Sequence, residues 1–157
     1  MQTVGLTALV EKLKLKNLTP EVDMSDTVIT TPNINRPALQ LAGYFDHFAS
    51  DRVQIIGYVE YTYLKHLTIE QRLPIYERFL SSEIPCVIFS SRTEPDDEFL
   101  KLAVKHNKPL LASDQETSPF MAECIRALST MLAPCISIHG VLVDVYGEGV
   151  LITGESG

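Results

Sequence analysis

The residues whose type and spacing could do chemistry stand near the end of the chain. Gly154-Glu155-Ser156-Gly157 directly follows the apolar, strand-like run Val150 to Thr153. A phosphate-binding loop of the form G-x-x-x-x-G-K-[ST] lies between a strand and a helix, and these four residues match its first four positions. Glycine suits such a loop because backbone N–H groups must turn inward and approach a phosphate closely. On the motif alone, a Gly-Ser turn after a strand is the better explanation, because Gly154 is the one required residue present.

His139 is the second candidate, at the end of the strand-like run that begins at Cys135. A strand-end histidine that bonds a backbone group is the simpler explanation. If its strand lies beside the phosphate loop, His139 could contact a phosphate or assist proton transfer, since imidazole titrates near neutral pH.

The other chemistry-bearing residues do not form a site at the sequence level. We expect no metal site within this chain, because the other histidines lack the pairing of zinc ligands: His47, His66 and His106. No serine lies in a G-x-S-x-G elbow, so a hydrolase triad has no support. Asp96-Asp97-Glu98 is most simply a helix start. Arg36, in a turn, could meet a ligand or a partner subunit, although a plain surface arginine is the simpler interpretation.

Charge and cysteine usage narrow the function classes. The net charge of −7 argues against a nucleic-acid partner, because phosphate neutralisation needs a basic surface. The first residues lack the pattern of a signal peptide, and no apolar run is long enough for a membrane span. The cysteines are odd in number and lack metal-ligand spacing, which favours buried free thiols and a reducing, cytoplasmic location: Cys86, Cys124 and Cys135.

The elements that must position these residues alternate between strands and helices. The apolar and β-branched runs predict strands at 26–31, 53–59, 86–89 and 109–112. Helical spacing and capping signals predict helices at 6–18, 38–48, 68–82, 94–106 and 118–131. Thr68 and Gln71 have the spacing of a capping box, and Ser118-Pro119 that of a helix start. The pattern predicts an α/β domain whose largely parallel sheet is flanked by helices.

The pattern changes after Pro134, where strand-like runs follow one another without a helix between them. We therefore expect two units, an α/β domain over residues 1–132 and the first strands of another domain over residues 133–157.

The segments named so far also carry a family resemblance. The run from Leu132 to Gly157, which contains Ile-Ser-Ile-His-Gly-Val-Leu-Val-Asp, closely resembles the entry to the catalytic domain of the bacterial HPr kinase/phosphorylase family. Asn35 to Phe45, Val53 to Gly57 and Thr117 to Glu123 resemble segments of the same family. The resemblance covers essentially the whole chain.

The resemblance implies a MurF-like N-terminal domain followed by a P-loop kinase domain. It implies an enzyme that uses ATP and Mg²⁺ to phosphorylate a regulatory serine of the phosphocarrier HPr, removes that phosphate at the same site, and controls carbon catabolite repression. Family members are typically homohexamers.

Carried over by position, His139 matches the family's active-site histidine. Gly154, Glu155, Ser156 and Gly157 match the start of its nucleotide-binding loop. The motif lysine, the magnesium-binding hydroxyl and the acidic proton acceptor are expected downstream, so this chain by itself is expected to be inactive and to bind no ATP tightly. The alternative is a non-catalytic ligand-sensing or oligomerisation domain attached to another P-loop NTPase.

Overall fold

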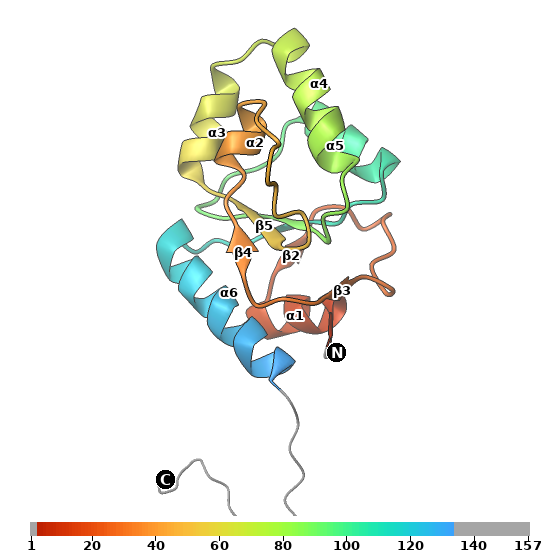
Figure 1. Ribbon diagram of the computed structural model, residues 1–157, viewed down its shortest axis with the longest axis vertical. Helices are drawn as coiled ribbons and strands as arrows, with labels where there is room; N and C mark the ends of the chain where they lie inside the picture. Colours follow the sequence, from red (N-terminus) through yellow and green to blue (C-terminus); the bar gives the residue numbers. More distant parts are fainter. Residues whose placement is uncertain (1–2, 134–157) are drawn as a thin grey trace, which may run out of the picture.

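A five-stranded mixed sheet forms the centre of the protein in the computed structural model, which describes residues 3–133 (Figure 1). In spatial order its strands are β2 (Lys16–Asn17), β7 (Leu110–Ala112), β6 (Val87–Phe89), β5 (Val53–Ile56) and β4 (Ile34–Asn35). β4, β5, β6 and β7 run parallel, and β2 pairs with β7 in the antiparallel direction. The predicted α/β class with a largely parallel sheet is therefore confirmed.

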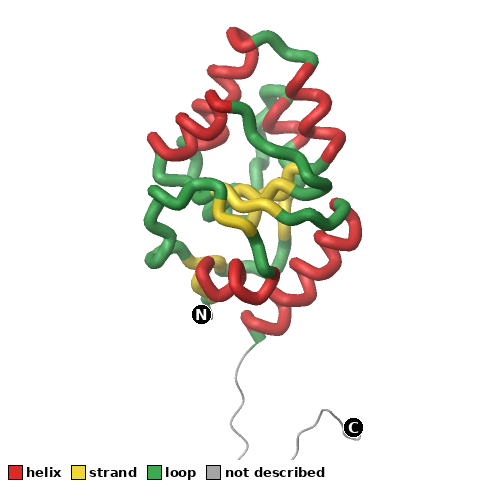
Figure 2. Tube along the Cα trace, turned by 180° about the vertical axis from the view of Figure 1, so that it is seen from behind, coloured by secondary structure: helices red, strands yellow, loops and turns green. Residues whose placement is uncertain are grey.

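Helices cover both faces of this sheet (Figure 2). One layer consists of α1 (Leu6–Leu13) and α6 (Thr117–Leu132). The other layer consists of α2 (Ala38–Leu41), α3 (Tyr58–Lys65), α4 (Ile69–Leu80) and α5 (Asp97–Lys105). A short antiparallel ribbon of β1 (Val4–Gly5) and β3 (Val28–Ile29) lies beside α1.

The two layers follow from the alternation of side chains along the central strands. Ile55 and Ile88 point into the core with α1 and α6, whereas the next residues, Ile56 and Phe89, point into the core with α2 to α5. All four side chains are buried. Because successive strand residues face opposite sides, a strand that is buried at every position must be covered on both faces.

The best-predicted helix is α4, whose start the local sequence specifies. Thr68 Oγ1 accepts a hydrogen bond from Gln71 N at 3.2 Å, and Thr68 N donates to Gln71 Oε1 at 2.8 Å. This is the reciprocal capping box that the spacing predicts. Asp96 likewise begins α5, because its Oδ1 accepts a hydrogen bond from Phe99 N at 2.8 Å.

Three predicted elements are too long, because the backbone leaves its regular conformation early. The first helix ends at Leu13, where Lys14 adopts a left-handed conformation (φ 55°), and the chain continues into β2. The second ends at Leu41, shortly before Gly43 with φ 98°. The strand predicted for residues 53–59 ends at Ile56, because α3 begins at Tyr58.

The predicted cap of the last helix is wrong. α6 begins at Thr117 and Glu116 is its N-cap residue, so Ser118 lies inside the helix. Pro119 is then the third helical residue, where a missing N–H removes no intrahelical bond. The first such bond is donated by Phe120 N to Glu116 O, at 3.0 Å.

Beyond α6, the predicted second unit at 133–157 lies outside the described residues except for Ala133, so the domain boundary stays a prediction. Within residues 3–133, no helix has the length and apolar character that a membrane crossing requires.

Two of the three cysteines are buried free thiols, as predicted for this residue type. Cys86 and Cys124 are both 0% exposed and lie in the core between the sheet and the layer of α1 and α6, with Cys124 on α6 itself. Burial raises the pKa of Cys86, and it raises the pKa of Cys124 to about 12. Both groups are therefore uncharged thiols at neutral pH, and the thiolate that attacks reagents is scarce.

We expect neither buried thiol to react with a disulfide reagent while the protein is folded. In a Cys135→Ser variant, which leaves Cys86 and Cys124, native protein should react at least about a hundredfold more slowly than free cysteine. Both thiols should react at once in concentrated urea. The release of thionitrobenzoate from Ellman's reagent measures the rate, and rapid release of two equivalents without urea would contradict the buried positions.

Candidate functional site

The site residues predicted from the sequence lie outside the part of the chain that the structure describes. These residues are His139, Gly154, Glu155, Ser156 and Gly157. Their roles remain predictions, and the geometry available concerns residues 3–133.

Within those residues, polar side chains gather where the parallel strands end. β5 ends at Ile56, β6 at Phe89 and β7 at Ala112, so the loops that follow them leave the same edge of the sheet. In open α/β sheets, ligands bind outside the carboxyl ends of the strands. This edge is therefore the candidate functional site of the described domain.

An ion pair between Arg36 and Glu60 joins two elements at this edge. Arg36 Nε donates to Glu60 Oε2 and Arg36 Nη2 donates to Glu60 Oε1, both at 2.7 Å. The Glu60 side chain is 2% exposed, and its Oε1 also accepts a hydrogen bond from Gly57 N at 3.0 Å. A buried carboxylate needs such partners, because an unpaired charge in the interior is strongly unfavourable. Arg36 thus makes an internal contact, which neither sequence interpretation anticipated.

Three hydroxyl groups attach α6 to the same edge. Thr117 Oγ1 lies 2.7 Å from Ser90 Oγ and 2.9 Å from Ser91 Oγ. Thr117 N donates to Ser91 Oγ at 3.0 Å, and Ser90 Oγ donates to Ile56 O at 3.1 Å. Ser91 and Arg92 have φ of 56° and 57°, an uncommon left-handed conformation for two successive residues that are not glycine. The chain turns sharply here, which brings Ser91 Oγ to the start of α6.

Gly57 allows the arginine and the threonine to approach each other. A Cβ at this position would lie 2.6 Å from Thr117 Oγ1 and 2.8 Å from Arg36 Nη2. Both distances are shorter than van der Waals contact, so any side chain at residue 57 would separate the start of α3 from the start of α6.

We expect Gly57→Ala to lower the free energy of unfolding by about 1–3 kcal/mol more than Gly5→Ala, because the new methyl group is overpacked. Gly5 is the matched control, since it is also a helix N-cap in extended conformation, and its nearest atom to an added Cβ is 3.8 Å away. Urea unfolding followed by circular dichroism measures both. Equal effects of the two substitutions would contradict the close approach at Gly57.

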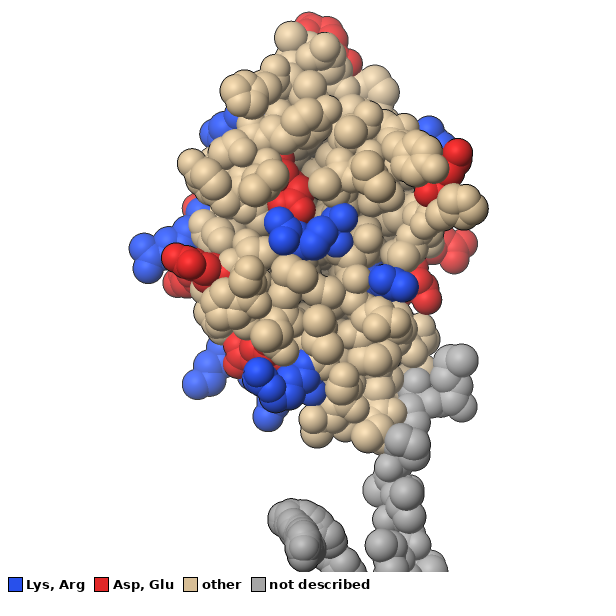
Figure 3. All heavy atoms as spheres, turned by 60° about the vertical axis from the view of Figure 1, so that its left-hand side comes forward, with Lys and Arg blue, Asp and Glu red and all other residues tan. Residues whose placement is uncertain are grey.

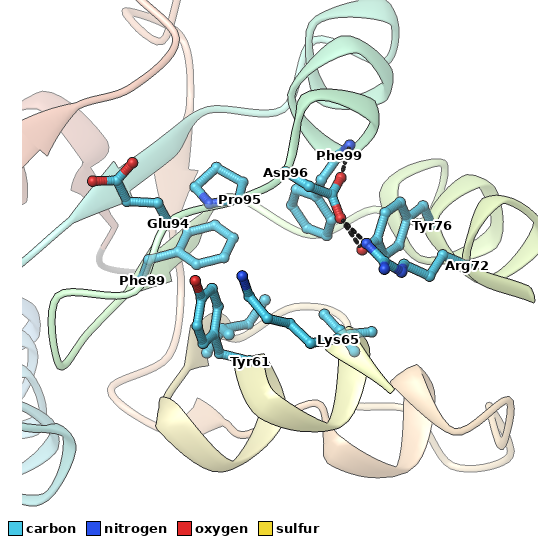
Figure 4. A pocket seen from close by; sticks show the side chains of 11 residues that line it. Tyr61, Lys65, Arg72, Tyr76, Phe89, Glu94, Pro95, Asp96 and Phe99 are labelled. Atoms are coloured by element: carbon cyan, nitrogen blue, oxygen red, sulfur yellow. Dashed lines mark hydrogen bonds and ion pairs between the residues drawn. The ribbon is translucent and has the colours of Figure 1, made fainter. Parts of the chain in front are cut away.

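One cavity at this edge has a volume of about 340 Å³ and lies between α3, α4 and the start of α5 (Figure 4). Its lining includes Ile56 and Phe89, the last residues of β5 and β6. Tyr61 and Lys65 come from α3, and Arg72 comes from α4. Cavities of this size are typical of small-molecule sites.

Asp96 connects two helices, α4 and α5, on one side of this cavity (Figure 4). Its Oδ2 accepts hydrogen bonds from Tyr76 Oη at 2.6 Å and from Arg72 Nη1 at 2.9 Å, while its Oδ1 caps α5. Burial, together with the hydrogen bond to Asp96, raises the pKa of Tyr76 far above its ordinary value. The tyrosine therefore stays a hydrogen-bond donor throughout the neutral range, and the three side chains hold α4 against α5.

We expect Asp96→Asn to lower the free energy of unfolding by about 1.5–3 kcal/mol, because charged hydrogen bonds are lost and an amide NH₂ would face two donors. Asp97→Asn is the matched control in the same helix start. The structure gives the Asp97 side chain no hydrogen bond within residues 3–133, so the expected loss is at most about 1 kcal/mol, from the helix dipole. Chemical unfolding measures both, and similar losses would contradict the role of Asp96.

Sequence reasoning identified Asp96 as a helix start and missed its other contacts. It also missed Glu60, Lys65 and Tyr76, which lie in helices or segments that show no motif. One local signal was available, because Glu60 stands three residues after Gly57 and its carboxylate accepts from that backbone N–H. No group of three or more His, Cys, Asp or Glu side chains within residues 3–133 is placed to hold a metal ion.

The surface beside the site is largely uncharged. Around α2 and α3, four large side chains are exposed, namely Leu39, Tyr58, Val59 and Tyr63. Figure 3 shows a face of the protein on which uncharged groups predominate, with a group of basic and acidic side chains near its middle and others around its edges.

The sequence of this chain is similar to proteins of one known family. The family described as HPr Serine kinase N terminus matches residues 4–128. The chain is 52% identical over 157 residues to an HPr kinase/phosphorylase of Lachnoclostridium phytofermentans, covering 100% of this chain and 51% of the relative. It is 46% identical to an HPr kinase/phosphorylase of Caldicellulosiruptor bescii, and the match covers 99% of this chain and 49% of that relative. The chain thus spans about half the length of these relatives.

A solved structure has a similar fold. It is the regulatory region of a Clostridium perfringens pyrophosphatase, with CBS and DRTGG domains, in complex with the activator diadenosine tetraphosphate. The TM-score is 0.50 at 15% identity, over 77% of this chain and 45% of that one. At this identity the likeness concerns the fold alone.

Proposed function

The chain belongs to the HPr kinase/phosphorylase family, and we propose that it forms the N-terminal half of a bifunctional enzyme of that activity. The enzyme would phosphorylate the regulatory serine of HPr with ATP and would also remove the phosphate. The observation that carries this proposal is the 52% identity over all 157 residues, a span that covers the positions of His139 and of the loop from Gly154. A role in carbon catabolite repression, a cytoplasmic location and assembly as a homohexamer belong to the same proposal.

The residues proposed to do the chemistry each have a distinct task. Backbone N–H groups from Gly154 to Gly157 would bind a phosphate of ATP, as in other phosphate-binding loops. His139 would contact the reacting phosphate or transfer a proton. ATP supplies the phosphoryl group, and Mg²⁺ neutralises charge that develops on it. The residues from Gly154 to Gly157 suit a phosphate rather than a metal, because a phosphate-binding loop presents backbone N–H groups. The hydroxyl that holds magnesium comes after the lysine of the motif, and these four residues match only its first four positions.

Residues 1–132 are proposed to be a non-catalytic, MurF-like domain of this enzyme. Two carboxylates at the sheet edge support the non-catalytic part of this proposal, because both are used in internal contacts. Glu60 pairs with Arg36, and Asp96 bonds Arg72 and Tyr76.

A chimera tests the kinase proposal. The 157 residues would be joined to the part of the Lachnoclostridium phytofermentans relative that follows the matched region. We expect the chimera to transfer labelled phosphate from ATP to HPr, while the 157-residue chain alone transfers none, since its sequence contains no Gly-Lys pair. Radiolabelling of HPr, with a serine-to-alanine HPr as the negative control, measures the transfer.

His139→Ala in the chimera should lower the rate by about 10²- to 10⁴-fold, the usual contribution of an acid–base residue. His66→Ala is the matched control, because His66 is exposed at the end of α3 and should leave the rate unchanged. A folded chimera that does not label HPr, or labelling by the 157-residue chain, would overturn the proposal.

A further inference from the structure

The cavity at the carboxyl end of β5 and β6 contains a cation that the fold does not use. Figure 4 shows the Lys65 side chain reaching from α3 into the cavity, with its ammonium group beside the rings of Tyr61 and Phe89. The ammonium lies 4.7 Å from the centre of the Tyr61 ring. Among residues 3–133, no carboxylate forms an ion pair with it. An ammonium held over an aromatic ring retains its donors for another partner.

The carboxylates near this cavity do not neutralise Lys65. Asp96 already accepts from Arg72, Tyr76 and the backbone of α5. The Glu94 carboxylate is turned away from the Lys65 ammonium (Figure 4). Lys65 therefore leaves a local positive charge inside a chain whose net charge is −7.

A second donor faces the same cavity from α4. Arg72 donates through Nε to Leu67 O at 3.1 Å and through Nη1 to Asp96, and no bond within residues 3–133 uses its Nη2. Its guanidinium stays charged at all ordinary pH values. Lys65 and Arg72 together can donate to an anionic group without releasing any contact that holds the fold.

The base of the cavity is apolar and closely packed. Phe89 and Phe99 meet edge to face with ring centroids 5.5 Å apart, and Tyr76 meets Phe99 in the same way at 4.8 Å. Ile56 and Leu64 complete the base, and both are buried. Flat apolar groups bind such surfaces through burial and aromatic contact.

We propose that this cavity is a binding site for a small ligand that combines a flat apolar ring with one anionic group, a phosphate or a carboxylate. The ring would lie against Tyr61, Phe89 and Phe99, and the anion would accept hydrogen bonds from Lys65 and Arg72. The site lies in residues 56–99, so the proposal does not depend on the kinase activity proposed above.

Titration of the 157-residue chain with phenyl phosphate, followed by amide NMR shifts, tests the proposal. For a ligand of this size we expect a dissociation constant on the order of 1 mM. The shifts should concentrate at the lining residues of α3, α4 and the start of α5. Benzoate serves as a second probe, and the tighter of the two identifies phosphate or carboxylate as the preferred anion.

Two further probes test whether binding needs both the aromatic ring and the anionic group. Phenol and inorganic phosphate each carry one of the two features, so each should bind at least about fivefold more weakly than phenyl phosphate. If either binds as tightly, the proposed ligand class is wrong.

Lys65→Gln should weaken phenyl phosphate binding by about tenfold, because a charge-assisted hydrogen bond is lost. Lys12→Gln is the matched control: it removes the same charge from an exposed position on α1, on the opposite face of the sheet, and should leave binding unchanged. Both lysines are exposed, so circular dichroism should show both variants folded. Unchanged binding in Lys65→Gln, or no shifts at the lining residues at high phenyl phosphate concentration, would overturn the proposal.

Discussion

Burial of the parallel sheet on both faces is the constraint on which the rest of this structure depends. β5 and β6 are buried at every position, and their side chains alternate between two cores. Such strands have no face that water can cover, so helices must lie on both sides. The loops that join strands to helices then become the places where polar side chains can meet. The carboxyl edge of the sheet is polar for this reason.

At that edge, four charged side chains attach helices to one another and to the neighbouring segments. Arg36 and Glu60 join the segment before α2 to the start of α3, and Asp96 joins α4 to α5. Paired in this way, a buried or half-buried charge stabilises the arrangement of helices, whereas alone it would destabilise the protein. Lys65 differs from these residues because no carboxylate within residues 3–133 pairs with its charge. This difference separates the groups that maintain the domain from the group available for recognition.

The two proposals concern different parts of the chain. Phosphoryl transfer is assigned to His139 and the loop from Gly154, whereas the cavity belongs to residues 56–99 of the described domain. A ligand in the cavity could influence phosphoryl transfer if it bound two states of the whole enzyme with different affinities. Such coupling is reciprocal, so nucleotide binding would then change the affinity of the cavity by the same factor.

The features that the sequence by itself determined are those formed by residues that are close together along the chain. The buried strands from Val53, Val87 and Leu110 were recognisable from runs of mostly apolar residues, and the Thr68 cap of α4 from a three-residue spacing. The family membership, too, was visible in the sequence. In each case the residues that cooperate are close together along the chain.

The tertiary structure decided whatever depends on distant partners. β2 and β4 are two-residue strands that exist because a neighbouring strand pairs with them. Arg36 meets Glu60 across 24 residues, and Thr117, the first residue of α6, meets Ser91 across 26. The cavity around Lys65 joins two strand ends, three helices and a loop. The spacing of residues along the chain does not predict that these elements lie together, because their arrangement depends on packing between distant segments.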